Sequence, residues 1–169
     1  MMNTADGAIL VFWLVCLVRG VFRGPVNELF AIAGVLSGLF AAAFFYPDFS
    51  YVLSGWMDSE PMRCLIGFFT LFGGIYLLAT VSGVIAVYLF HLRRPGWVNR
   101  ALGAGFGILK GMLAVAVLLI PLVAFLPNQS AWMGRSLIVP YENRISEKMV
   151  RILPQTIHTR FTSHMPTYK

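Results

Sequence analysis

The sequence has little charge for its length. Asp, Glu, Lys and Arg make up only 12% of the 169 residues, whereas hydrophobic residues make up 58% and the mean hydropathy is +0.75. A soluble domain carries about a quarter charged residues, and a chain this short has too much surface to hide the deficit in a larger core. The composition therefore excludes an ordinary soluble domain and predicts an integral membrane protein that faces the lipid bilayer.

Cysteine, histidine and catalytic signatures are also scarce. The two cysteines, Cys16 and Cys64, stand at or inside apolar stretches and form neither a CxxC pair nor a disulfide framework. The three histidines are scattered without the spacing of metal ligands. No GxSxG, HExxH or P-loop motif is present. We therefore expect no metal, no cofactor and no enzymatic activity.

The basic balance of the chain does not point to nucleic acid. The net charge is +6 and the sequence pI is about 9.8. The basic residues are spread over loops and a tail between apolar runs, which is typical of membrane proteins with basic flanks. A nucleic-acid-binding domain would gather them into one patch or stripe.

Long apolar runs predict an all-α, polytopic fold. The first run, extended to residues 7–22 if Arg19 snorkels, gives a helix of about 24 Å, which is short for a hydrocarbon core of about 30 Å. It has no basic segment before it and no small-residue cleavage site after it, so we interpret it as a retained helix. We expect four membrane-spanning helices in a domain over residues 1–127. The apolar runs are residues 8–18, 29–45, 64–90 and 101–126.

The chain changes character after Pro127. Apolar residues recur there at steps of three and four, which predicts a C-terminal amphipathic helix within residues 128–153, lying on the membrane surface or capping the bundle. Residues 154–169 are polar, and we expect them to be a disordered tail.

The charges of the connections predict an orientation. A tight turn at Gly24-Pro25 joins the first two helices. Its flanks are basic, as is the connection before the fourth run, whereas residues 46–63 are acidic. The positive-inside rule then places the first and third connections in the cytoplasm and both termini outside. The basic tail is the one segment that does not fit this orientation.

Small residues repeat every four positions in two of the runs. Gly103, Gly107 and Gly111 form a flat stripe on the fourth predicted helix, and Gly34 and Gly38 have the same spacing on the second. Such stripes let helices approach closely in lipid. The stripe serves either packing within the chain or contact with a second copy, and the sequence leaves both open.

Lys110 is the most unusual residue, because it stands inside an apolar run. Its ammonium either snorkels to the cytoplasmic side or pairs with a carboxylate, for which Glu28 is the best candidate. With Arg19, Arg100 and Asp6 these two residues form a predicted intramembrane charge cluster. An ionisable residue in a membrane is a functional-site hypothesis by default, although a Lys–Glu pair could equally fix helix register. Asp6 either complements the dipole of the first helix or binds a partner.

The order of these residues resembles the colicin V production protein family. The first block of that pattern is an early Asp, then Arg-Gly, an acidic residue and a Gly in the second helix. The second block opens the fourth helix, and a Ser-x-x-x-Pro segment follows the last span. The matching residues here are Asp6, Arg19-Gly20, Glu28 and Gly34; Arg100, Gly103, Gly107, Lys110 and Gly111; and Ser136 with Pro140.

The resemblance implies a bacterial inner-membrane protein that supports colicin V production or export and cell-envelope homeostasis. Relatives fused to an extracytoplasmic serine protease place their C-terminus outside, as the charge argument does here. The leading hypothesis is an accessory or scaffold protein whose partner is another membrane protein or a second copy. The alternative is a small channel or transporter subunit with Lys110 and Glu28 along a polar path.

Overall fold

The part of the chain that the structure describes folds into four long helices, which follow one another in the order that the apolar runs predicted. The computed structural model describes residues 4–55, 57–91, 96–125, 145–146 and 149–150. Its helices are α1 (Thr4–Arg23), α2 (Pro25–Val52), α3 (Glu60–Leu89) and α4 (Trp97–Phe125), with a short 3-10 turn, η1 (Leu53–Gly55), after α2. No strand occurs in these parts of the chain, so the prediction of an all-α fold is confirmed for them.

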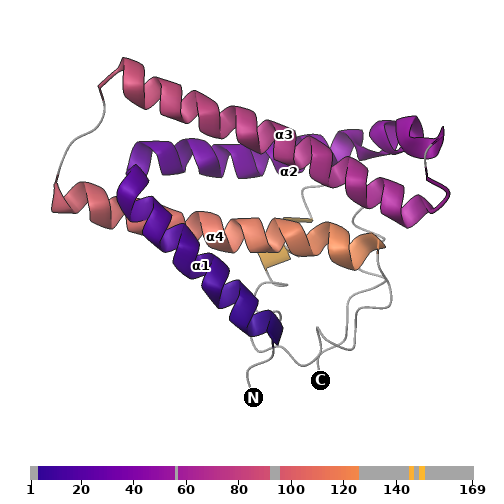
Figure 1. Ribbon diagram of the computed structural model, residues 1–169, viewed down its shortest axis with the longest axis horizontal. Helices are drawn as coiled ribbons and strands as arrows, with labels where there is room; N and C mark the ends of the chain where they lie inside the picture. The colour runs from indigo at the N-terminus through magenta and orange to yellow at the C-terminus, as the bar shows by residue number, and fades with distance from the viewer. Residues whose placement is uncertain (1–3, 56, 92–95, 126–144, 147–148, 151–169) are drawn as a thin grey trace.

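The helices α2, α3 and α4 lie along one common direction, and α1 runs obliquely to them (Figure 1). α2 packs along α3, α1 packs along α4, and the contact between α2 and α4 joins the two pairs. The α1–α2 turn lies at the same end of the bundle as the end of α3 and the start of α4 (Figure 1). This end, called the basic end below, carries Arg19, Arg23, His91 and Arg100.

The turn between α1 and α2 forms where the sequence predicted it. Gly24 has a φ of 82°, a left-handed conformation that glycine adopts without steric cost. Its N–H donates to the Gly20 carbonyl over 3.0 Å. Pro25 then takes the first turn of α2, where a missing N–H costs nothing. The turn sets the direction of α2 and therefore the position of Glu28.

α2 is longer than its apolar run. The interpretation of residues 46–63 as a polar connection was wrong for the first part, because α2 continues through Pro47 to Val52. The reason is tertiary: the Tyr46 ring packs on Phe125 with the ring centroids 5.3 Å apart, and the buried Ser50 hydroxyl lies 3.6 Å from the Cys64 sulfur. Packing against α3 and α4 outweighs the local signals of Pro47 and Asp48.

The number of candidate spans differs from the prediction. Within the described residues, three helices are long and apolar enough to cross a membrane, and they cover 25–55, 60–89 and 97–122. The prediction of four spans is therefore corrected to three. α1 is the exception because its 20 residues include Asp6, Arg19 and Arg23, and each charge in a short helix costs free energy in hydrocarbon.

The amphipathic helix predicted for residues 128–153 is not among the helices that the structure describes, and the predicted tail, 154–169, lies outside the described residues. Two of the described residues at 145–146 and 149–150 contact the bundle. The Ser146 hydroxyl donates to the Ala116 carbonyl of α4 over 3.1 Å, and Val150 is buried in the core.

The outer faces of α1 and α3 remain apolar and exposed. A membrane protein presents such faces to lipid, whereas a soluble monomer rarely exposes so large an apolar surface. The most exposed side chains on these two faces include Val11, Leu14, Val15, Phe22, Leu77, Leu78, Tyr88, Leu89 and Phe90.

Candidate functional site

An ion pair in the interior links α2 to α4. The Lys110 ammonium donates to Glu28 Oε2 over 2.5 Å, between residues 82 positions apart in the chain. Glu28 is fully buried, and Lys110 is 4% exposed. Of the two interpretations that the sequence left open for Lys110, pairing with Glu28 is the one in the structure.

The backbone explains why these two residues meet. Glu28 stands in the first turn of α2, just after the Gly24–Pro25 turn, and Lys110 is near the middle of α4. Helical side chains tilt toward the N-terminus of their helix. The Lys110 side chain is therefore directed back along α4 toward the basic end, where Glu28 lies. In a medium without water, each charge needs such a partner, because leaving either one alone is costly.

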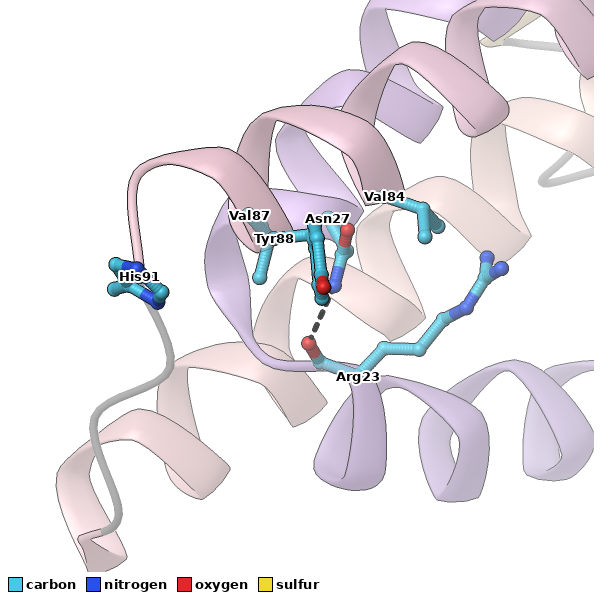
Figure 2. A pocket seen from close by; sticks show the side chains of 6 residues that line it. All are labelled: Arg23, Asn27, Val84, Val87, Tyr88 and His91. Atoms are coloured by element: carbon cyan, nitrogen blue, oxygen red, sulfur yellow. Dashed lines mark hydrogen bonds between the residues drawn. The ribbon is translucent and has the colours of Figure 1, made fainter.

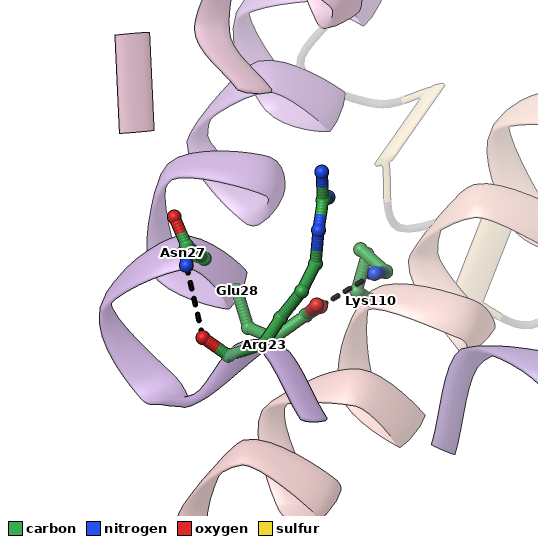
Figure 3. A network of polar contacts seen from close by, with 4 residues as sticks. All are labelled: Arg23, Asn27, Glu28 and Lys110. Atoms are coloured by element: carbon green, nitrogen blue, oxygen red, sulfur yellow. Dashed lines mark hydrogen bonds and ion pairs between the residues drawn. The ribbon is translucent and has the colours of Figure 1, made fainter. Parts of the chain in front are cut away.

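Two further polar residues surround the pair (Figure 3). Asn27 Nδ2 donates to the Arg23 carbonyl over 2.9 Å, which ties the start of α2 to the end of α1. Asn27 is 6% exposed, and its Oδ1 has no hydrogen-bond partner in the structure. Glu28 Oε1 is likewise buried and unpartnered. Arg23 and Asn27 were not predicted as site residues, although their polar side chains close to Glu28 in the sequence were a signal.

The predicted charge cluster is only partly assembled. Arg19 lines a groove of about 340 Å³ together with Lys110, beside apolar side chains of all four helices. Arg100 is exposed in the first part of α4 and does not line this groove. Asp6 is fully buried near the start of α1, at the other end of that helix from Arg19. The structure thus joins Glu28, Lys110 and Arg19 in one region and leaves Arg100 and Asp6 outside it.

The glycine stripe of α4 lies against α1. A Cβ added at Gly107 would lie 2.6 Å from the Cys16 carbonyl oxygen, and one added at Gly103 would overlap the Gly20 carbonyl. Gly111 lies against the Cys16 side chain. The structure therefore shows packing within the chain at this stripe. The matching residues, Cys16 and Gly20 on α1 and Gly24 in the turn after it, were not predicted, although they have the same spacing of four.

The glycines of α2 lie in a different helix–helix contact, the one between α2 and α3. Gly34 lies against Ala79 and Tyr76, and Gly38 lies against Phe72, all on α3. The absence of side chains at these two positions lets the aromatic rings of α3 rest directly on the α2 backbone. The Glu28–Lys110 pair joins α2 to α4, and the glycine contacts join α1 to α4 and α2 to α3. Together these contacts link all four helices.

A second groove opens at the basic end (Figure 2). Its volume is about 510 Å³, and it lies between the α1–α2 turn and the last turns of α3. His91 follows the end of α3 with a left-handed φ of 47°. The residues that line the groove are Arg23, Asn27, Val84, Val87, Tyr88 and His91.

The comparisons with known proteins assign the family. No curated protein and no solved structure matches the chain. The family model described as "Colicin V production protein" matches residues 5–147, which contain α1 except its first residue, all of α2 to α4 and the Glu28–Lys110 pair. The helical membrane bundle and this match together place the chain in the colicin V production protein family.

Proposed function

We propose that this protein is an inner-membrane accessory or scaffold protein that supports the production or export of a colicin V-type toxin and the integrity of the cell envelope. It acts by binding another membrane protein or a second copy of itself, and it performs no turnover. Membership of the family supports the link to the toxin.

The observation that carries the scaffold role is the closed Glu28–Lys110 pair. Both side chains are almost fully buried and neutralise each other inside the bundle. We infer that this pair specifies one arrangement of the helices, because any arrangement that separates the two charges leaves each of them buried without a partner. A scaffold needs such a fixed arrangement, because its partners recognise a shape.

The proposed orientation puts the basic end in the cytoplasm. Arg19 and Arg23 stand at the end of α1 and Arg100 in the first turn of α4, so all three belong to the basic end. Asp48 stands near the end of α2, and Asp58 and Glu60 stand at the start of α3, so these acids belong to the opposite end. The positive-inside rule favours a cytoplasmic location for the basic end. The end of α4 would then face outward.

The function is tested in a colicin V-producing bacterium that lacks its own family member. Expression of this chain should restore secreted toxin, measured as growth inhibition of a sensitive strain. Solubilised under mild conditions, the chain should copurify with a membrane partner or with a differently tagged second copy. No restoration of toxin, together with recovery of a clean monomer, would contradict the proposal.

A small channel or transporter subunit is the second candidate. The groove that Lys110 and Arg19 share favours it, because Arg19 adds a positive charge beside the neutralised Glu28–Lys110 pair and could guide an anion. The purified protein in proteoliposomes should then conduct anions, and Lys110→Met should abolish the flux. Absence of flux in the wild type would exclude this candidate.

A further inference from the structure

The groove at the basic end carries an unsatisfied polar atom. Asn27 Nδ2 donates to the Arg23 carbonyl, so the amide is oriented with Oδ1 as its free acceptor (Figure 2). The Asn27 side chain is buried, with only 6% of the residue exposed, and its Oδ1 has no hydrogen-bond partner. A buried acceptor without a donor destabilises the protein, because it has lost its hydrogen bonds to water. A ligand that brings a donor to this wall of the groove would recover that cost.

The same groove is positively charged. The Arg23 side chain forms no ion pair with any residue that the structure describes. The nearest acid along the chain, Glu28, is already paired with Lys110. A guanidinium such as that of Arg23 binds a phosphate through two parallel hydrogen bonds. The groove therefore suits a phosphate group.

The surroundings of the groove are those of a lipid. Val84 and Val87 form its apolar wall on α3, and the exposed apolar face of α3 continues from there toward the middle of the bundle. Tyr88 and Trp97 are 79% and 81% exposed at this end, and such aromatic side chains mark the headgroup level of a membrane.

From these three observations we propose that the groove binds a membrane phospholipid whose headgroup carries a hydrogen-bond donor beyond its phosphate, as ethanolamine and glycerol headgroups do. The phosphate pairs with the Arg23 guanidinium, and the headgroup donor meets Asn27 Oδ1. The acyl chains lie along the α3 face that begins at Val84. A choline headgroup has no such donor and leaves Asn27 unsatisfied. This site is independent of the toxin-related function.

Native mass spectrometry of the purified full-length protein in detergent tests the site. The protein is titrated with dioleoyl phosphatidylethanolamine, phosphatidylglycerol and phosphatidylcholine, which share acyl chains and differ only in the headgroup. We expect the ethanolamine and glycerol lipids to bind about tenfold more tightly than the choline lipid, from one hydrogen bond between a lipid donor and the Asn27 acceptor. Equal binding of all three lipids would overturn the proposal.

Substitutions separate the two contacts. Arg23→Gln should weaken binding of all three lipids, because each carries the phosphate. Asn27→Leu should remove the preference and leave binding of the choline lipid unchanged. The matched control is Arg100→Gln, which removes a cation at the same end but outside the groove and should change nothing. A preference that survives Asn27→Leu would overturn the assignment of Oδ1.

A competition measurement and a folding control complete the test. Free phosphoethanolamine should fail to compete with the lipid, and full competition would show that a soluble phosphate ester is the ligand. The helical circular dichroism of each variant is compared with that of the wild type. If Asn27→Leu does not fold, the wild-type preference and Arg23→Gln decide the outcome.

Discussion

Lys110 Nζ lies 2.5 Å from Glu28 Oε2 and thereby joins the middle of α4 to the first turn of α2. The contact between α2 and α4 connects the α2–α3 pair to the α1–α4 pair. The ion pair therefore lies where the two halves of the bundle meet.

Removal of one partner of this pair should destabilise the bundle. Lys110→Met leaves the Glu28 carboxylate buried without its counter-ion, and we expect the free energy of unfolding to fall by about 3–5 kcal/mol. Unfolding by SDS, followed by circular dichroism, measures the change. Arg100→Met is the control, because Arg100 is exposed on the same helix and its loss should cost less than about 0.5 kcal/mol. A Lys110→Met protein as stable as the wild type would contradict the structural role of the pair.

The α1–α4 seam should not tolerate a methyl group. In Gly107→Ala the new Cβ would lie 2.6 Å from the Cys16 carbonyl oxygen, which belongs to a backbone that cannot yield without moving α1. We expect a loss of about 1–3 kcal/mol in the free energy of unfolding, as overpacking typically costs.

Gly105→Ala is the matched control for this seam. Gly105 is two residues away on the same helix, and a Cβ there would meet nothing within 4 Å. The substitution should be neutral or slightly stabilising, since alanine has the higher helix propensity. Equal effects of Gly105→Ala and Gly107→Ala would rule out the close contact of α1 with α4.

The hydrogen bond from Ser146 to α4 should keep the residues next to Ser146 packed against that helix. Ser146→Ala removes the hydrogen bond to the Ala116 carbonyl, and we expect a loss of about 1 kcal/mol. Hydrogen exchange at residues 145–150 measures it, and their amides should exchange faster in the variant. Ser82→Ala is the control, because the Ser82 hydroxyl bonds only within α3 and is exposed. Unchanged exchange in Ser146→Ala would show that the contact does not hold this segment.

The positions of the helices could be predicted from the sequence, because long apolar runs and the Gly24–Pro25 turn are local signals. The pairing of Lys110 with Glu28 was one of two alternatives, since a spacing of 82 residues carries no information about contact. The α2 extension through Pro47 was missed because it depends on packing of Tyr46 with Phe125. The sequence shows that the glycines of α4 form a stripe, but which helix packs against that stripe is decided by the tertiary fold.

The orientation predicts which loops a membrane-impermeant thiol reagent reaches in intact cells. Ser54→Cys, in η1 at the end of the bundle opposite the basic end, should be labelled from outside. Trp97→Cys, at the start of α4 on the basic end, should be labelled only after the membrane is permeabilised. The native Cys16 and Cys64 are buried and serve as an internal background. The reverse pattern of labelling would invert the proposed orientation.

The double substitution Glu28→Met/Lys110→Met tests the central claim most directly, with secreted toxin as the readout beside each single variant. A buried ion pair replaced by apolar residues of similar volume is often neutral for stability. If the pair serves only to fix the bundle, the double variant should restore toxin export to near the wild-type level, while Lys110→Met alone fails. A double variant as inactive as Lys110→Met alone would show that the charges themselves carry the function, and the scaffold account would be wrong.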